Sequence, residues 1–254
     1  MKIELENVSK SFKNRSDKEA LRVLSGLTFE VRPSEILSVV GPSGCGKSTI
    51  INLIAGFIFP DEGKIVVNGN MVKEPSSSRT VVFQDHAIFP WMTVKQNIEF
   101  GLKCKGVSKA EQEKTVTELL NKVRLDKFAN RYPDELSGGM KQRVALARAF
   151  AVKPEIILMD EPFASLDQQT RDILQEEFLK LQNEIAQTVL FVTHNIEEAL
   201  FLGDRVVVLS NRPAQVKEIF DVPFKKPRSP DIRNHPQFIE LKHKIWHSLR
   251  QEIA

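Results

Sequence analysis

The chain has 254 residues, of which 41% are hydrophobic and 27% charged, and its formal net charge is +3. These values are typical of a globular protein and exclude a long coiled coil or a disordered chain. The basic residues are spread along the sequence instead of forming one stripe, so we expect no nucleic-acid partner.

The amino terminus carries no sign of export. Its first residues, MKIELENV, alternate charged with apolar side chains and lack the apolar stretch of a secretory signal, so we expect a cytosolic protein. The most apolar run, residues 50–59, is too short for a membrane helix, which takes about 20 residues. Because Cys45 and Cys104 lie far apart, we expect neither a disulfide framework nor a structural zinc site.

Short runs rich in valine and isoleucine alternate with longer segments of helical spacing. The short runs predict buried strands at residues 36–40, 64–68, 80–83, 156–159, 189–193 and 206–209. The longer segments predict helices at residues 47–55, 109–123, 139–152, 168–187 and 196–202. Strands that alternate with helices predict an α/β fold.

Two regions interrupt this alternation. Residues 93–133 are polar and helical without a strand run, so we expect a helical subdomain, at about residues 93–145, to be inserted between two parts of the sheet. After residue 222, the segment PFKKPRSPDIRNHP has too many prolines for regular structure, and residues 238–253 regain an amphipathic pattern. We expect residues 223–254 to form a linker and a terminal helix. For the basic PFKKPRSP part we expect solvation, with a position near lipid headgroups as the alternative.

The clearest motif connects the predicted strand at 36–40 to the helix that follows. It fits the pattern GxxxxGK[ST] and consists of Gly41, Pro42, Ser43, Gly44, Cys45, Gly46, Lys47, Ser48 and Thr49. The glycines let N–H groups point inward, and the helix dipole adds positive charge, so such a loop binds a polyphosphate. Lys47 would reach the β- and γ-phosphates, Ser48 would ligate Mg²⁺, and Thr49 would face the α-phosphate. Kinases and GTPases share the pattern, so the reaction stays open.

Two carboxylates follow the buried run at 156–159. A core strand presents such residues at the carboxyl edge of its sheet, where ligands of α/β proteins bind. Asp160 can hold the Mg²⁺ shell, and Glu161 can polarise a water for attack on the γ-phosphate.

A third motif, LSGGMKQR, leads directly into an alanine-rich segment at residues 136–143. Ser137 would cap this helix, whose free N–H groups, together with Gly138 and Gly139, offer a second anion site. The motif resembles the signature of ATP-binding cassette (ABC) ATPases, which kinases and GTPases lack. The resemblance covers about residues 2–222. It implies a P-loop NTPase core with a mainly parallel sheet, an N-terminal antiparallel β-subdomain and an inserted helical subdomain.

The resemblance also assigns roles to four further residues. Gln84 matches the glutamine that contacts Mg²⁺ and the attacking water and senses the membrane partner. Asp167, in Ser-Leu-Asp, matches a loop that crosses the dimer interface, and His194 matches the switch histidine at the γ-phosphate. Phe12 corresponds to the aromatic residue that stacks on adenine.

The resemblance further implies how the chain works and with what partners. Two copies would form a head-to-tail homodimer that holds two ATP molecules with Mg²⁺, each between Lys47 of one copy and Ser137 of the other. The dimer would power an integral membrane permease at the cytoplasmic face of the membrane, and a solute-binding protein would act indirectly. A soluble ABC ATPase that acts on nucleic acid or assembly factors is the alternative.

The segment after Gln84 points to a subfamily. Its Phe-Pro-Trp sequence, residues 89–91, resembles the nitrate, sulfonate and taurine importers, and the LSGGMKQR form agrees with this. The solute stays open among nitrate, alkanesulfonate, taurine and thiamine-precursor pyrimidines. We expect Phe89, Trp91 and Met92 to grip a short permease helix. Local packing between the subdomain and the core is the other interpretation of these apolar side chains.

Overall fold

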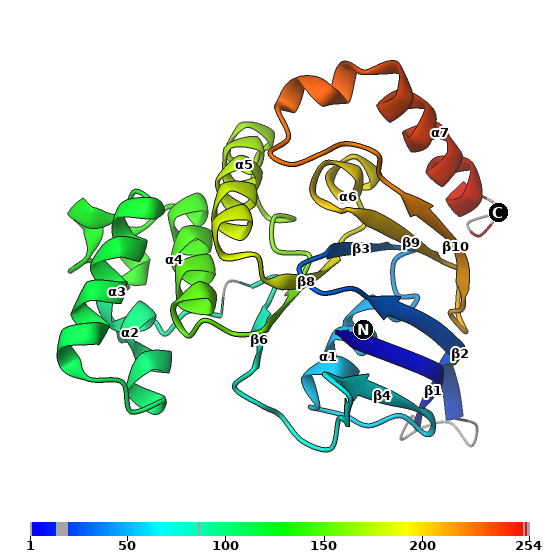
Figure 1. The fold of residues 1–254 in the computed structure, drawn as a ribbon, viewed down its shortest axis with the longest axis horizontal. Helices are drawn as coiled ribbons and strands as arrows, with labels where there is room; N and C mark the ends of the chain where they lie inside the picture. Colours follow the sequence, from blue (N-terminus) through cyan, green and yellow to red (C-terminus); the bar gives the residue numbers. More distant parts are fainter. Residues whose placement is uncertain (1, 14–19, 86, 251, 253–254) are drawn as a thin grey trace.

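A parallel sheet forms the centre of the molecule. The structure is a computed structural model and describes residues 2–13, 20–85, 87–250 and 252. In this sheet the strand order is β10-β9-β3-β8-β7-β6, and all pairs are parallel except β10 with β9 (Figure 1). The strands are β3 (Ile36–Val40), β6 (Arg79–Val82), β7 (Ile156–Asp160), β8 (Thr188–Val192), β9 (Arg205–Leu209) and β10 (Val216–Asp221). The predicted α/β fold is thus confirmed.

A smaller antiparallel sheet lies beside the first one. Its strand order is β2-β1-β4-β5, and its members are β1 (Ile3–Lys13), β2 (Ala20–Val31), β4 (Glu62–Val67) and β5 (Asn70–Met71). The helix α1 (Lys47–Ala55) packs between the two sheets, and its Ile50, Ile51, Leu53 and Ile54 belong to one apolar cluster with residues of both. This position directs the N-terminus of α1 to the carboxyl edge of the parallel sheet.

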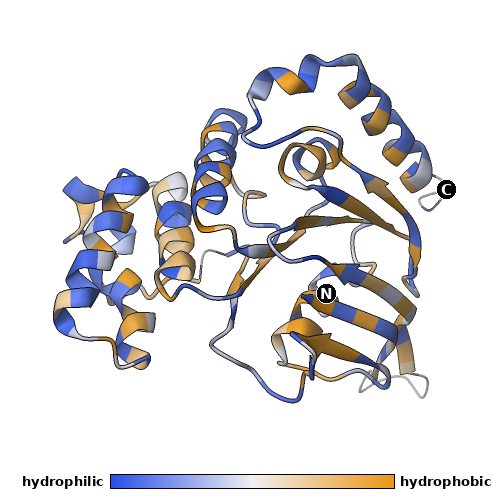
Figure 2. Ribbon diagram, viewed as in Figure 1, coloured by the Kyte–Doolittle hydropathy of each residue, from blue (hydrophilic) through white to orange (hydrophobic). Residues whose placement is uncertain are grey.

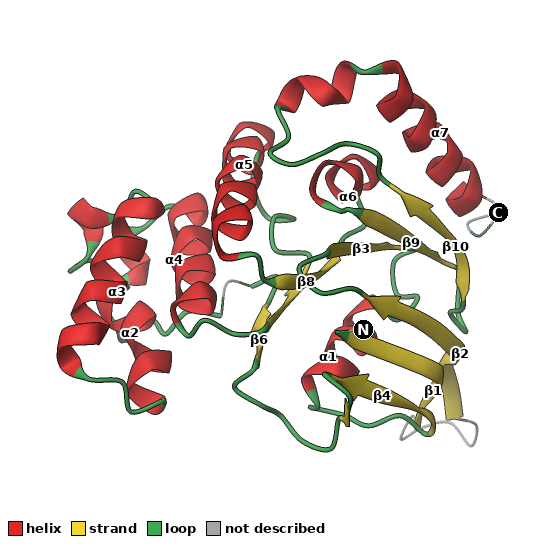
Figure 3. Ribbon diagram, in the orientation of Figure 1, coloured by secondary structure: helices red, strands yellow, loops and turns green. Residues whose placement is uncertain are grey.

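The helices α2, α3 and α4 gather at one end of the molecule, away from the antiparallel sheet (Figure 3). They comprise α2 (Val94–Cys104), α3 (Lys109–Lys122) and α4 (Gly138–Ala151), with short 3₁₀ helices at η1 (Asp126–Phe128) and η2 (Pro133–Glu135). A capping box formed by Thr93 and Gln96 begins α2. Apolar side chains of these helices form one cluster with β7, β8 and α5, so the bundle is packed onto the sheet.

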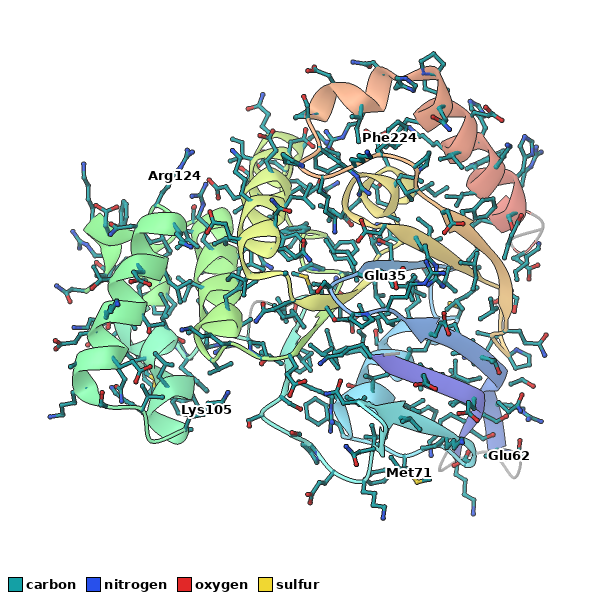
Figure 4. The ribbon with its side chains drawn as sticks, viewed as in Figure 1. Glu35, Glu62, Met71, Lys105, Arg124 and Phe224 are labelled. Carbon is teal, nitrogen blue, oxygen red and sulfur yellow. The ribbon has the colours of Figure 1, made fainter. Side chains whose placement is uncertain are left out.

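The remaining helices cover the other face of the parallel sheet. These are α5 (Gln168–Ile185), α6 (Ile196–Leu202), the 3₁₀ helix η3 (Pro230–Asn234) and α7 (Pro236–Arg250). The C-terminal α7 runs over α6 and β10, and its apolar side faces them (Figure 2). Phe224, labelled in Figure 4, packs against Phe238 with ring centroids 6.0 Å apart. None of the helices that the structure describes has the length and apolar character to cross a membrane.

The segment after residue 222 differs from its prediction. The proline-rich stretch contains regular structure, because η3 lies within it and α7 begins at Pro236. Its arginine is also not solvated: the guanidinium of Arg228 is buried and donates to the carbonyl oxygens of Phe201 and Gly203 at 3.0 and 2.8 Å. Lys226 and Arg228 both form ion pairs with Asp204. Buried charges of this kind need partners, and these contacts supply them.

Other differences concern the strands. The run at 64–68 belongs to the half-exposed β4 of the antiparallel sheet, so it is not a buried strand of the core. The run at 80–83 forms the edge strand β6, which is only partly buried. The strand β10 has no predicted counterpart, since its sequence VKEIFD lacks an apolar run. The predicted terminal helix reaches residue 253, which lies outside the described residues.

Candidate functional site

The phosphate-loop motif curls between β3 and α1, at the edge of an open cavity of about 360 Å³. All five residues of β3 are buried, which fixes where the loop begins. Gly44 and Gly46 have φ values of +75° and +122°, a region that other residues rarely adopt. The cavity is lined by Phe12, Val23, Ser43, Gly44, Gly46, Lys47, Ser48, Thr49, Glu161 and Arg212.

Lys47 is only 6% exposed despite its charge. Its ammonium donates to the carbonyl oxygens of Gly41 and Pro42 at 3.1 and 3.0 Å. It also lies 3.9 Å from a carboxylate oxygen of Glu161. The lysine is therefore held by the loop itself, with one positive charge directed to the cavity and one acid beside it.

Glu161 and His194 are brought together from different strands. Glu161 follows β7, and its backbone N–H donates to the carbonyl oxygen of Val192 in β8 at 2.9 Å. Its carboxylate lies 2.7 Å from Nδ1 of His194, which follows β8. Glu161 has φ +46°, a strained conformation for a residue with a side chain, and such strain clusters at functional sites. The pair can orient a water and accept its proton.

Asp160 and Ser48 form a possible place for Mg²⁺. Burial raises the pKa of Asp160, while a side-chain hydrogen bond with Ser48 opposes the rise. A hydroxyl and a carboxylate thus lie side by side, and Mg²⁺ prefers such a small oxygen set completed by phosphates and water. No cluster of three His, Cys, Asp or Glu residues that could hold a metal occurs in the described part of the chain. The donor set fits a Mg²⁺ ion that arrives with a nucleotide.

The signature residues lie in a separate cavity. Ser137 caps α4, where its hydroxyl accepts from the N–H of Met140 at 3.4 Å. Ser137 and Gly139 line a cavity of about 380 Å³ together with Arg124, Leu125, Phe128, Met140, Arg143, Thr170 and Ile173. Arg124 is labelled in Figure 4, on the helical bundle. No residue lines both this cavity and the phosphate-loop cavity.

Gln84, Gly138 and Asp167 are predicted site residues that line neither cavity. Gln84 is exposed and follows β6, next to the end of β7 that carries Asp160. Asp167 caps α5 by accepting from the N–H of Thr170 at 3.0 Å, and this bond lowers its pKa. Gly138 begins α4 and is exposed to solvent. Gln84 thus lies near Asp160, whereas Gly138 and Asp167 lie at the adjoining N-termini of α4 and α5.

The Phe-Pro-Trp loop is rigid at its base and open at its tip. The fully buried Asn97 of α2 accepts from the N–H of Phe89 at 2.8 Å and donates to the carbonyl oxygen of Met92 at 3.0 Å. The ring of Phe89 packs against Phe100 at 4.7 Å, while Trp91 is 69% exposed. An aromatic side chain is thus presented on a fixed loop. His86, in the same segment, lies outside the described residues.

Sequence reasoning missed two residues of these sites. Arg212 lines the phosphate-loop cavity and donates to the Gly44 carbonyl oxygen, although 168 positions separate them in the sequence. Asn97 organises the Phe-Pro-Trp loop. Neither residue lies in a motif: Arg212 contacts Gly44 across the fold, whereas Asn97 contacts residues a few positions before it. The two cysteines are free, Cys45 buried and Cys104 exposed.

Comparisons with known proteins agree with this geometry. The profile of the ABC transporter family matches residues 24–164. The taurine import ATP-binding protein TauB of Roseobacter denitrificans is 41% identical, over 92% of this chain and 90% of its own length. The bicarbonate transport ATP-binding protein CmpD of Synechococcus elongatus is 43% identical, over 94% of this chain and 86% of its own.

A solved structure gives the same result for the fold. The ATP-binding cassette MJ0796, a dimer in a post-hydrolysis state bound to ADP and Pi, is 31% identical. It superposes with a TM-score of 0.76 over 88% of this chain and 100% of its own. The signature motif, the cavity geometry and these likenesses agree, and the chain belongs to the ABC transporter family as one of its ATPases.

Proposed function

We propose that this chain is the ATP-hydrolysing subunit of an importer and that two copies of it complete each catalytic site. The observation that carries the proposal is the separation of two anion sites on one chain. The phosphate loop and the signature helix both suit a γ-phosphate, yet they line different cavities. A head-to-tail homodimer brings Ser137 of one copy opposite Lys47 of the other.

In this site each group has a separate task. The phosphate loop, from Gly41 to Thr49, cradles the triphosphate of ATP, and Phe12 stacks on the adenine. Ser48 and Asp160 hold Mg²⁺, which neutralises charge on the phosphates when it is bound. Glu161 accepts the proton of the attacking water.

The residues outside the phosphate-loop cavity complete the site after closure. His194, whose Nδ1 contacts Glu161, orients that carboxylate and contacts the γ-phosphate. Gln84 contacts the ion and the water, while Gly138, Gly139 and Asp167 act from the second copy. Each copy contacts the nucleotide of the other copy only when ATP is bound. ATP binding therefore closes the dimer, and hydrolysis releases it.

The partner is an integral membrane permease, and the chain lies peripherally at the cytoplasmic face of the membrane. We assign the docking surface to the Phe-Pro-Trp loop, since Trp91 is exposed on a base that Asn97 fixes. We propose a small anion or organic solute of the nitrate, sulfonate and taurine type. Relatives are named for taurine, which is one of these solutes, and for bicarbonate, which the sequence does not predict. A solute-binding protein contributes indirectly, and we propose no nucleic-acid partner.

The chain divides accordingly. We propose that residues 1–222 form the ATPase unit, with the helical subdomain at about residues 93–145, and that residues 223–254 form a tail. The subdomain carries the signature motif, and its Asn97 holds the docking loop that precedes it, so movement of the permease and movement of the signature site are mechanically linked.

Affinity purification of the tagged chain from membranes of its native host tests the importer function. We expect mass spectrometry to recover a multi-span permease. Recovery of soluble factors or nucleic acid alone would overturn the transport function and favour the soluble alternative, while leaving the ATPase chemistry.

A tryptophan variant tests the docking surface. Trp91→Ala removes the exposed side chain without touching the nucleotide site, so basal ATPase activity stays near that of the wild type while permease-stimulated activity is lost. Trp246→Ala, at the chain's other tryptophan on α7, is the matched control and keeps full stimulation. Normal stimulation of the Trp91 variant by permease would show that the loop serves only local packing.

A further inference from the structure

A turn far from the phosphate loop in sequence contacts its backbone. Residues 210–215 connect β9 to β10, and Arg212 in this turn donates from Nε and Nη2 to the carbonyl oxygen of Gly44, at 2.9 and 2.5 Å. The same side chain lines the cavity beside Lys47 and Phe12. A second cationic group thus lies at the nucleotide cavity, outside every motif of the sequence.

The turn is fixed on two sides. The N–H of Ala214 donates to the carbonyl oxygen of Val23 in β2 at 2.8 Å, and the N–H of Ser25 donates back to Ala214 at 3.1 Å. On the other side, the N–H of Asn211 donates to the carboxylate of Glu252 at 3.0 Å. A side chain that extends from a fixed turn loses less freedom when it binds its partner, so the Arg212 contact is preorganised.

The contact engages the backbone of the phosphate loop beside the cavity that Gly44 and Arg212 both line. Such a loop binds phosphate when its N–H groups point inward, which turns carbonyl groups outward, where they need donors of their own. A Cβ at Gly44 would lie 2.8 Å from Nη2 of Arg212, so the guanidinium packs directly on this glycine. Two charge-assisted hydrogen bonds therefore favour the conformation in which Gly44 has φ +75°.

We propose that Arg212 is a positioning residue for ATP binding: it holds the Gly44 carbonyl outward and so keeps the phosphate loop in the form that accepts the triphosphate. The inference rests on the proposed function, in which this loop binds ATP. The apparent affinity for ATP falls when a smaller fraction of the protein has the loop conformation that binds the triphosphate. Loss of the contact therefore raises KM for MgATP, whereas kcat persists because Lys47, Ser48 and Glu161 are unchanged.

Steady-state ATPase kinetics of the full chain test this role. For Arg212→Ala we expect KM for MgATP to rise about tenfold, as for loss of a charge-assisted hydrogen bond, with kcat unchanged. Arg212→Lys keeps the charge and one donor, and recovers part of the affinity. Arg32→Ala, which removes an exposed arginine outside the cavity, leaves both constants unchanged.

Thermal unfolding without nucleotide separates positioning from a general loss of structure, and we expect equal midpoints for the wild type and both Arg212 variants. If Arg212→Ala has an unchanged KM, or only a lower kcat, the inference about Arg212 is wrong. The proposed function is still upheld in that case, because the wild type hydrolyses ATP. Equal loss of affinity in the Lys and Ala variants with a lowered midpoint would assign Arg212 to folding only. A wild type that hydrolyses no ATP would overturn the proposed function itself.

Discussion

Glu161 shows how a single residue combines strain with function. Its φ of +46° is costly for a residue with a side chain, and the neighbouring strand compensates through the bond from its N–H to Val192. This conformation places the carboxylate between Lys47 and His194, at 3.9 and 2.7 Å. The sequence predicts that an acid follows β7, but the contact with His194 exists only because β7 and β8 are neighbours in the sheet.

A second acid supports the segment that carries His194. Glu198 of α6 is buried, accepts from Gln175 at 2.8 Å and also accepts from the hydroxyl of Thr193. Burial raises the pKa of Glu198. The folded protein therefore binds a proton here more tightly than the unfolded chain does, so this group lowers the free energy of unfolding as pH rises from the ordinary glutamate value through the raised pKa.

Glu198→Gln tests this linkage. The amide carries no charge, so the variant gains stability over the wild type across that pH range, by about 1.4 kcal/mol for each unit of pKa shift. Below the ordinary glutamate pKa of about 4.3, the difference no longer changes with pH, because the wild-type side chain is then neutral in both states. Denaturant unfolding at several pH values measures it. A difference that does not vary with pH would contradict the assigned pKa direction.

Among the elements, α4 and α5 meet at their N-termini, where the signature and Asp167 lie. A Cβ at Gly139 would lie 2.5 Å from Cγ2 of Thr170, so the glycine permits this close approach. The motif predicted a glycine-rich cap from sequence alone. The second role of Gly139, its contact with α5, depends on how the two helices pack, and no local sequence pattern predicts it.

Gly139→Ala tests the approach of the helices. The added methyl displaces α4 from α5 and costs about 1–3 kcal/mol of stability, with a matching fall in ATPase activity. Thr170→Ser removes the opposing methyl, so the double variant regains most of the loss. Thermal unfolding and ATPase assays on the two single variants and the double variant measure the coupling. Additive effects would show that the methyl contact is not the cause.

At the scale of the whole molecule, the predictions succeeded where the chemistry is local. The strands at β3 and β7 and the helices α1 and α6 follow from apolar runs and helical spacing, and the phosphate loop and signature are consecutive residues. Contacts between residues far apart in the sequence leave no such pattern in it. Arg212 follows β9 and reaches Gly44, which follows the neighbouring strand β3. Arg228 is buried against Asp204, although the sequence predicts a basic, solvated linker for its segment.

Because the two cavities are separate, one chain holds only half of each proposed catalytic site. Each cavity is open, and each offers groups suited to one side of a γ-phosphate. Within one chain, Lys47 and Ser137 cannot act on the same ATP as they are placed here. A second copy supplies the missing half, and its binding energy depends on the nucleotide.

The most direct test is light scattering of Glu161→Gln with saturating ATP and Mg²⁺, coupled to size-exclusion chromatography. The amide keeps the shape of the side chain but cannot accept the proton of the attacking water, so ATP persists and we expect a stable dimer. The double variant Glu161→Gln with Lys47→Ala, which binds ATP poorly, stays monomeric. A Glu161→Gln variant that remains monomeric while ATP is bound would contradict the account.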